Sequence, residues 1–173
     1  MMSDHSNQSE QKCSNQLIHE NGEEFKICSY NDVSILFRVR DQYFNATKLF
    51  SDGGRDFRTF KKGDRWRKII NEHEKRVQNG VCAKMLGPIY EIKKGFSNDI
   101  RGQYVHPKLI HFVADWVSID YAFKVADIMD LINKNNQLKN KVLEETIREL
   151  QEENEYLNKV IEKLDLTVGD MLL

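Results

Sequence analysis

Apolar and polar residues alternate between Phe25 and Tyr43, which predicts β-strands with one buried face. The first strand carries Phe25 and Ile27, and Asn31-Asp32 supply a two-residue turn. Every second residue of the next strand is apolar: Val33, Ile35, Phe37 and Val39. The pattern therefore predicts a β-hairpin that is buried on one side.

Helical spacing replaces the alternation at Asn45, and three short helices with glycines at their ends are predicted. Asn45, Asp56 and Asp64 each precede a helical apolar pattern, where a short polar side chain can accept an unpaired backbone N–H. Gly53-Gly54 and Gly63 end the first two helices. The third helix has a stripe that faces the core: Trp66, Ile69, Ile70, His73 and Val77.

Alternation returns in residues 89–94 and 103–105, which predict a second hairpin around the loop of residues 95–102. Pro107 then begins a helix, because proline suits the first helical position. Ser118 is placed to cap the next helix. The patterns thus predict both strands and helices along the chain.

From Leu143 the apolar residues recur at steps of 4 and 3, which is the heptad pattern of a coiled coil. β-branched residues at a with leucine at d favour a parallel pair of helices, and one buried asparagine at a fixes register. Upstream, residues 135–142 leave this frame, which predicts a register shift or a joint. The predicted dimerisation residues are Leu143, Ile147, Leu150, Asn154, Leu157, Ile161 and Leu164. Alternatively, the helix folds back on the globular part, and strand number and direction remain open.

Three segments follow from these patterns: 1–22, 23–133 and 134–173. The first is rich in Ser, Asn and Gln and is expected to be a disordered tail, since it has little apolar surface to bury. The second is expected to be a single globular domain and the third a coiled coil.

Charge is strongly segregated along the chain, although the formal net charge is only −1. Residues 38–108 hold 17 Lys and Arg against 8 Asp and Glu. Residues 1–37 hold 2 against 6, and residues 109–173 hold 7 against 13. A basic domain of this kind is typical of polyanion binders, because each neutralised phosphate releases condensed counterions.

The basic side chains cluster in the short helices and around the second hairpin. We expect the first group to contact phosphates and base edges and the second to clamp the nucleic-acid backbone. The alternative is a charged surface without function. The first group is Lys48, Arg55, Arg58, Lys61, Lys62, Arg65, Arg67 and Lys68, and the second is Lys93, Lys94 and Arg101.

Catalytic and metal-binding patterns are lacking in the sequence. It has no Gly-x-Ser-x-Gly, no Gly-rich loop ending in Gly-Lys-Ser/Thr, no Cys-x-x-Cys and no His-x-x-x-His. We therefore expect no enzymatic activity, catalytic residue, cofactor, metal or small-molecule substrate. No apolar run reaches the ~20 residues of a membrane span, and no membrane association is expected.

Several ordered motifs resemble the KilA-N domain of large DNA viruses and phages, which is related to the fungal APSES DNA-binding domain. They span about residues 25–132 and comprise YFNATKL (43–49), DGG (52–54), IYEI (89–92), IRGQYVHP (100–107), ADWVS (114–118) and FKVA (123–126). Poxviral members that carry a C-terminal RING finger look closest. A RING needs eight Cys and His ligands, and after His111 this chain has neither residue.

The resemblance implies an α+β, winged-helix-like DNA-binding module. The helices that follow Asn45 and Asp56 would form a helix-turn-helix, and the 89–105 hairpin would be the wing. We expect a non-enzymatic DNA-binding homodimer inside the host cell, in the cytoplasmic viral factory or the nucleus. Two alternatives stay open: an interaction adaptor whose coil recruits host or viral factors, and an RNA binder.

Overall fold

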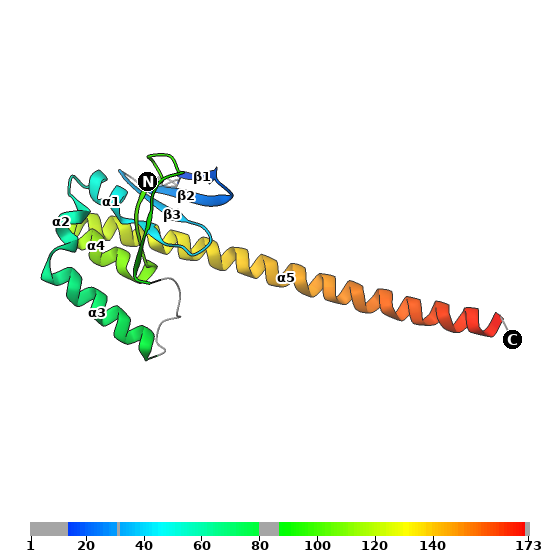
Figure 1. Cartoon of the computed structure of the whole chain (residues 1–173). Helices are drawn as coiled ribbons and strands as arrows, with labels where there is room; N and C mark the ends of the chain where they lie inside the picture. The colour runs from blue at the N-terminus through cyan, green and yellow to red at the C-terminus, as the bar shows by residue number, and fades with distance from the viewer. Residues whose placement is uncertain (1–13, 31, 80–86, 172–173) are drawn as a thin grey trace, which may run out of the picture. The chain divides into compact units, whose positions relative to one another are not determined.

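The computed structural model describes residues 14–30, 32–79 and 87–171. They form two compact units, Met1–Asp130 and Leu131–Leu173. The first is a mixed α/β unit with an antiparallel sheet, and the second is the C-terminal part of one long helix (Figure 1).

Over the described residues the strands form one sheet in the order β1-β2-β3-β4-β6-β5, and every neighbouring pair is antiparallel. The two hairpins predicted from alternation are both present, as β2–β3 and β5–β6. The bounds of the strands are β1 Ser14–Glu20, β2 Glu23–Tyr30, β3 Val33–Arg38, β4 Phe44–Asn45, β5 Ile89–Ile92 and β6 Gly102–Val105.

The N-terminal segment corrects one prediction. A disordered tail through residue 22 is wrong for residues 14–20, which form β1 and pair with β2 from Ser14↔Ser29 to Glu20↔Glu23. Ile18 packs against the buried cluster around Phe25. A polar segment becomes ordered because β2 supplies its backbone partners, which local composition cannot reveal. Residues 1–13 lie outside the described residues.

Strand β3 is buried on both faces, so the predicted one-sided hairpin is wrong. Ile35 and Phe37 are buried as expected, but Leu36 between them is buried too, and Val39 is exposed. The register Tyr30↔Val33 leaves residues 31 and 32 as the turn, as predicted, although Asn31 itself is outside the described residues.

Leu36 belongs to a cluster of buried side chains that covers the second face of the sheet. Phe25 packs on Tyr104 of β6 and on Phe96 of the β5–β6 loop, with ring centroids 6.1 and 5.8 Å apart. The Glu20 carboxylate, at the β1–β2 turn, accepts hydrogen bonds from the backbone N–H and hydroxyl of Ser97 in that loop. The first and last hairpins of the sheet are therefore tied together.

The helices follow the predicted order with small changes at their ends. Gly63 rather than Asp64 is the N-cap of α3, and a short 3-10 turn, η1, precedes α4. The Ser118 hydroxyl accepts from the Tyr121 N–H at 3.0 Å at the start of α5, as predicted. The bounds of the helices are α1 Ala46–Asp52, α2 Phe57–Lys61, α3 Asp64–Gln78, η1 Pro107–Leu109, α4 Ile110–Val117 and α5 Ile119–Met171.

Aromatic rings hold the short helices together. Phe60 of α2 lies 5.4 Å from both Phe50 and Trp66, and 5.3 Å from Trp116, measured between ring centroids. Helices of five and seven residues are too short to be stable alone. Their order therefore comes from this shared core.

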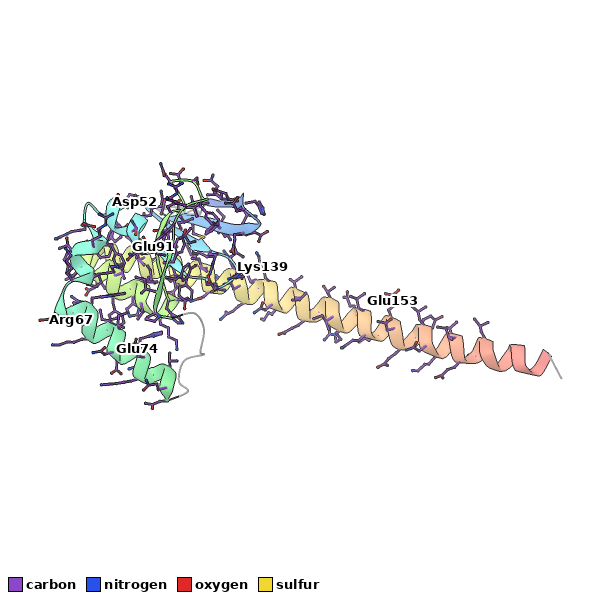
Figure 2. All side chains as sticks on the ribbon, in the orientation of Figure 1. Asp52, Arg67, Glu74, Glu91, Lys139 and Glu153 are labelled. Carbon is purple, nitrogen blue, oxygen red and sulfur yellow. The ribbon has the colours of Figure 1, made fainter. Side chains whose placement is uncertain are left out.

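Helix α5 is unbroken through residues 135–142, where the heptad frame predicts a register shift or a joint. Lys139 and Glu153 radiate from its surface (Figure 2). A coiled coil requires a second helix, so the pairing itself stays a prediction.

Candidate nucleic-acid interface

Asn45 fixes the start of α1 and links it to the second hairpin. Its side-chain oxygen accepts from the Lys48 N–H at 2.9 Å, as predicted for an N-cap. Its amide nitrogen donates to the carbonyls of Ile100 and Arg101, at 3.1 and 3.3 Å. One buried side chain thus positions the α1 N-terminus against the residues that lead into β6.

A second link runs between the same two elements. The Thr47 hydroxyl oxygen accepts from the Gln103 N–H at 2.9 Å. Between these contacts lies Gly102, with φ +148°, where an added Cβ would lie 2.7 Å from the Asn45 side-chain oxygen. Glycine is therefore required by both the backbone conformation and the close approach.

Helix α2 is positioned by a cap and by two buried rings. The Asp56 carboxylate accepts from the Arg58 N–H at 3.0 Å. Phe57 and Phe60 are buried, which leaves Arg58 on the exposed side of the helix. The sequence Asp-Phe-Arg-Thr-Phe thus presents a cation next to the second hairpin.

A hollow of about 280 Å³ lies between these elements, and we call it the α2–β5 hollow. Its lining comes from the first turn of α1, the N-terminus of α2 and both strands of the β5–β6 hairpin. The lining residues are Thr47, Asp56, Phe57, Arg58, Glu91, Ile92, Lys93, Arg101, Gly102 and Gln103.

Three of the eleven predicted nucleic-acid contacts meet in this hollow: Arg58, Lys93 and Arg101. Arg58 is exposed, and its guanidinium has no ion pair with a described residue. Lys93 pairs with Glu91 at 3.2 Å. Arg101 donates from Nε to the Phe96 carbonyl at 2.6 Å and from a terminal nitrogen to Asn98 at 3.2 Å, so it shapes the hairpin loop.

Other predicted contacts face different neighbours. The Arg55 guanidinium stacks over the Trp116 ring at 5.1 Å, and Arg65 pairs with Asp115, so both lie against α4. The Lys61 ammonium lies 5.9 Å from the centre of the Phe57 ring. Arg67 pairs with Asp64 and points outward from α3 (Figure 2).

The remaining cations lie outside the hollow's lining. Lys62 and Lys94 are exposed and Lys48 is half-buried, whereas Lys68 lines a different cavity described below. The eleven side chains therefore surround the first unit's helical end and hairpin rather than lining one cleft. Their contact with nucleic acid stays a prediction.

Sequence reasoning missed the polar side chains that build the hollow. Asn45 was assigned only to a cap, and Thr47 and Gln103 were not singled out. Two short polar residues, Asn45 and Thr47, stand two positions apart at the start of α1, and this spacing is the only local sign of their role. The residues to which they hydrogen-bond lie 55 or more positions away in the sequence. Among the described residues no cluster of three His, Cys, Asp or Glu side chains is arranged to hold a metal ion.

The predicted dimerisation residues are exposed in the single chain. Asn154 is exposed, and its six apolar companions are between 47% and 59% exposed: Leu143, Ile147, Leu150, Leu157, Ile161 and Leu164. In the described part of the chain, no helix is both long and apolar enough to cross a membrane.

In a comparison with known protein families, residues 28–135 match the model of the KilA-N domain. Putative KilA-N domain-containing protein L4 of Acanthamoeba polyphaga mimivirus is 34% identical over 115 residues, covering 66% of this chain and 24% of that protein. Protein 006L of Invertebrate iridescent virus 6, described in the same way, is 30% identical over 130 residues, covering 71% of this chain and 36% of that protein. The chain thus matches only a quarter to about a third of the length of these relatives.

An uncharacterized fowlpox virus protein, FPV248, is 28% identical over 107 residues, covering 59% of this chain and 67% of that protein. Among solved structures, MBP1 from Saccharomyces cerevisiae aligns with a TM-score of 0.41 at 12% identity. That alignment covers 66% of this chain and 97% of the yeast chain.

Proposed function

Because this chain belongs to the KilA-N family, we propose that it is a non-enzymatic viral DNA-binding protein that dimerises through its C-terminal helix. The observation that carries the proposal is the segregation of charge: 17 Lys and Arg against 8 Asp and Glu in residues 38–108, between two acidic segments. The relatives in large DNA viruses support the viral assignment. We further propose that it acts inside the host cell, in the cytoplasmic viral factory or the nucleus.

The α2–β5 hollow supplies the geometry for such binding. In the proposed complex, α1 and α2 serve as a helix-turn-helix and the β5–β6 hairpin as a wing. Arg58 comes from α2 and Lys93 from the end of β5, so one sugar–phosphate strand can contact both elements. The Asn45 and Thr47 hydrogen bonds hold helix and hairpin together before binding, which reduces the entropy lost on association.

The Lys93–Glu91 pair does not prevent this role. Both side chains are largely exposed, and such surface pairs contribute only about 0–1 kcal/mol. A phosphate can therefore replace Glu91 as the partner of Lys93 with only a small loss of free energy. Arg101 contributes by holding the β5–β6 loop in place and by adding positive charge to the hollow, rather than by a direct contact with the phosphate.

Dimerisation is supported by the exposed heptad stripe of the second unit. Six leucine and isoleucine side chains along one helix face are about half exposed, and a second copy would remove them from water. Two linked DNA-binding units gain affinity through effective concentration without any new contact.

The test is a gel-shift series with duplex DNA, single-stranded DNA and duplex RNA at two salt concentrations. With about six phosphates neutralised per unit, log affinity for DNA should fall with log salt at a slope of roughly −5. Binding of duplex DNA that does not change with salt contradicts the proposal. Preferential binding of duplex RNA assigns the surface to RNA instead.

Arg58→Glu combined with Lys93→Glu locates the site. Reversing two charges should weaken duplex binding by about tenfold or more and make the salt slope shallower by about 2. The matched control is Lys139→Glu combined with Lys141→Glu, which reverses two charges at exposed lysines of the second unit and should leave binding unchanged. Equal effects of the two variants would show that only net charge matters. Lys61→Glu with Lys62→Glu then tests the adjoining end of α2.

A further inference from the structure

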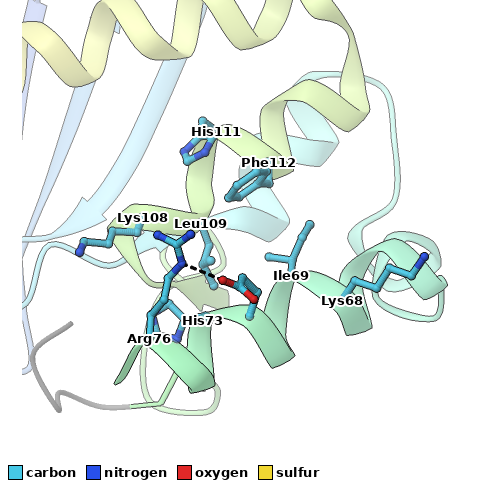
Figure 3. Close-up of a pocket in the computed structure, with 9 residues that line it drawn as sticks. Lys68, Ile69, His73, Arg76, Lys108, Leu109, His111 and Phe112 are labelled. Atoms are coloured by element: carbon cyan, nitrogen blue, oxygen red, sulfur yellow. Dashed lines mark hydrogen bonds and ion pairs between the residues drawn. The ribbon is translucent and has the colours of Figure 1, made fainter. Parts of the chain in front are cut away.

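A second cavity, of about 600 Å³, lies between α3 and the η1–α4 segment. It shares no lining residue with the α2–β5 hollow, and its volume lies within the range of small-molecule sites. Ile69 and Phe112 occupy the middle of Figure 3, with Lys68 and Lys108 on either side of them in this view. We call it the α3–α4 cavity.

The rim of this cavity is positively charged. Lys68, Arg76 and Lys108 line it, and Glu72 is the one carboxylate among the lining residues. Glu72 accepts from Arg76 Nε at 3.1 Å, and the lining as a whole holds three cations against this one carboxylate. The rim therefore favours a ligand that carries negative charge.

The walls are apolar and partly aromatic. Ile69 faces the cavity from α3, and Leu109 and Phe112 face it from η1 and α4. The Phe112 side chain of α4 is 38% exposed, whereas the phenylalanines of α1 and α2 are buried. The His111 ring lies against it, with centroids 4.0 Å apart. An exposed ring at a cavity wall offers a flat ligand a surface on which to stack.

His73 adds a polar group that lacks a partner. Its side chain is 6% exposed, and neither ring nitrogen makes a hydrogen bond to a described residue. Burial, with nearby Lys108, lowers the pKa of His73, so the ring is neutral near pH 7. A neutral imidazole has one donor and one acceptor nitrogen, and leaving both unmatched in the interior is costly.

His73 lines the α3–α4 cavity, and Arg76 lies next to it in Figure 3. Arg76 is exposed, so it can rotate without disturbing the core. A donor or acceptor on the edge of a ligand can then pair with one of the two ring nitrogens.

We propose that the α3–α4 cavity binds a nucleotide: a flat base stacked on Phe112, its polar edge toward His73, and its phosphate held by Lys68, Arg76 and Lys108. An acidic peptide matches the cations and the apolar wall, but it does not use the exposed ring together with the unmatched imidazole. The ligand is either a free nucleotide or one nucleotide of a nucleic-acid strand, since the chemistry is shared. The site lies outside the α2–β5 hollow, and Lys68 is the one of its residues that is also among the eleven predicted nucleic-acid contacts.

The test is a titration of the full chain with adenosine 5′-monophosphate at pH 7.5, followed by isothermal calorimetry or by NMR shifts of the His73 and Phe112 amides. Parallel titrations use inorganic phosphate, a six-nucleotide single-stranded DNA and a glutamate-rich peptide. Saturable binding of the monophosphate or of the oligonucleotide is expected, and the tighter of the two identifies the source of the nucleotide.

Phe112→Ala should weaken nucleotide binding about tenfold or more, the usual effect of losing one aromatic–base stack. Lys68→Glu, at an exposed position that does not affect folding, should weaken it about tenfold as well. Lys139→Glu, at an exposed lysine of the second unit, is the matched control and should leave it unchanged.

Three results overturn the proposal. One is that neither the monophosphate nor the oligonucleotide binds at millimolar concentration. Another is that inorganic phosphate binds as tightly as the monophosphate, because the base then contributes nothing. The third is that the peptide binds while both nucleotide ligands do not.

Discussion

The two units of this chain use similar apolar side chains in opposite ways. In Met1–Asp130, Phe25, Phe50 and Phe60 are at most 2% exposed, and they contact rings from segments far apart in the sequence. In Leu131–Leu173, the leucines and isoleucines of the heptad stripe are about half exposed. The first unit covers its own apolar surface, whereas the apolar stripe of the second unit is exposed in the single chain.

The two units differ in burial because the first has several layers of secondary structure and the second has only one helix. A sheet and several helices bury one another's apolar faces, so a chain of about 110 residues can complete a core. One helix carries a single stripe and has no second layer of its own. Folding of the first unit is therefore intramolecular, while burial of the stripe in the proposed dimer depends on protein concentration.

The largest expected effect is on the second unit. Leu157→Glu places a charge at a d position in both helices of the proposed dimer. Losing two buried leucines at about 1.5–3 kcal/mol each weakens dimerisation by about a hundredfold or more. Light scattering at micromolar concentration should show the monomer mass.

Tyr156→Glu is the matched control, because Tyr156 is a neighbouring exposed residue off the stripe. Its mass should stay that of the dimer. If Leu157→Glu leaves the mass unchanged, the heptad stripe is not the dimer interface. The proposal that a second copy covers the exposed stripe would then be wrong.

In the first unit, Phe60→Ala should reduce the free energy of unfolding by about 3–5 kcal/mol, since it empties the centre of the ring cluster. Chemical denaturation followed by circular dichroism measures this. Phe123→Ala, at a 70% exposed ring in the same unit, should change it by less than about 0.5 kcal/mol. Similar losses at both positions would show that burial does not separate them.

Buried polar groups make the first unit sensitive to pH. Burial, with the neighbouring His73 and Lys108, lowers the pKa of His106 to about 4, from an ordinary 6.5. The unfolded chain therefore binds a proton first as pH falls, and stability present above pH 6.5 is lost on the way down to pH 4. Between pH 7.5 and pH 5 the loss is about 2 kcal/mol.

His106→Asn should flatten this pH dependence. His106 Nδ1 accepts from the Lys108 N–H at 3.2 Å, and asparagine can keep that cap without titrating. Thermal unfolding at pH 5 and pH 7.5 gives the readout, with His19→Asn, at an exposed histidine, as the control. An unchanged slope would mean that another group carries the pH response.

The smallest expected effect lies at the junction of helix and hairpin. Gly102→Ala strains a backbone at φ +148° and pushes the Asn45 side chain, so we expect a loss of about 1–2 kcal/mol. Gly87→Ala is the control, because an added Cβ there meets no atom within 4 Å. Weaker DNA binding by Gly102→Ala, measured where the variant is folded, would show that the hollow must be preformed.

Local pattern predicted most of the elements, and its errors share one cause. The caps at Asn45, Asp56 and Ser118 hold because each acts on a backbone N–H two or three residues away. Strand β1 was missed because its partner is β2, and Leu36 was assigned outward because the β5–β6 hairpin that covers it comes some 50 residues later. Similarly, the charge pattern identified the basic domain but not that Arg58, Lys93 and Arg101 share one hollow.

By itself the amino-acid sequence determined the order of the helices, the caps at Asn45, Asp56 and Ser118, two hairpins, the heptad stripe of α5 and the excess of positive charge in residues 38–108. All of these depend on neighbours within a few positions or on simple composition. Tertiary structure alone decided the pairing of β1, the double burial of β3 and the two cavities. Those features arise where segments that are distant in the sequence pack against each other. Such packing produces no periodic pattern of apolar and polar residues in either segment, so it cannot be predicted from the sequence of one segment alone.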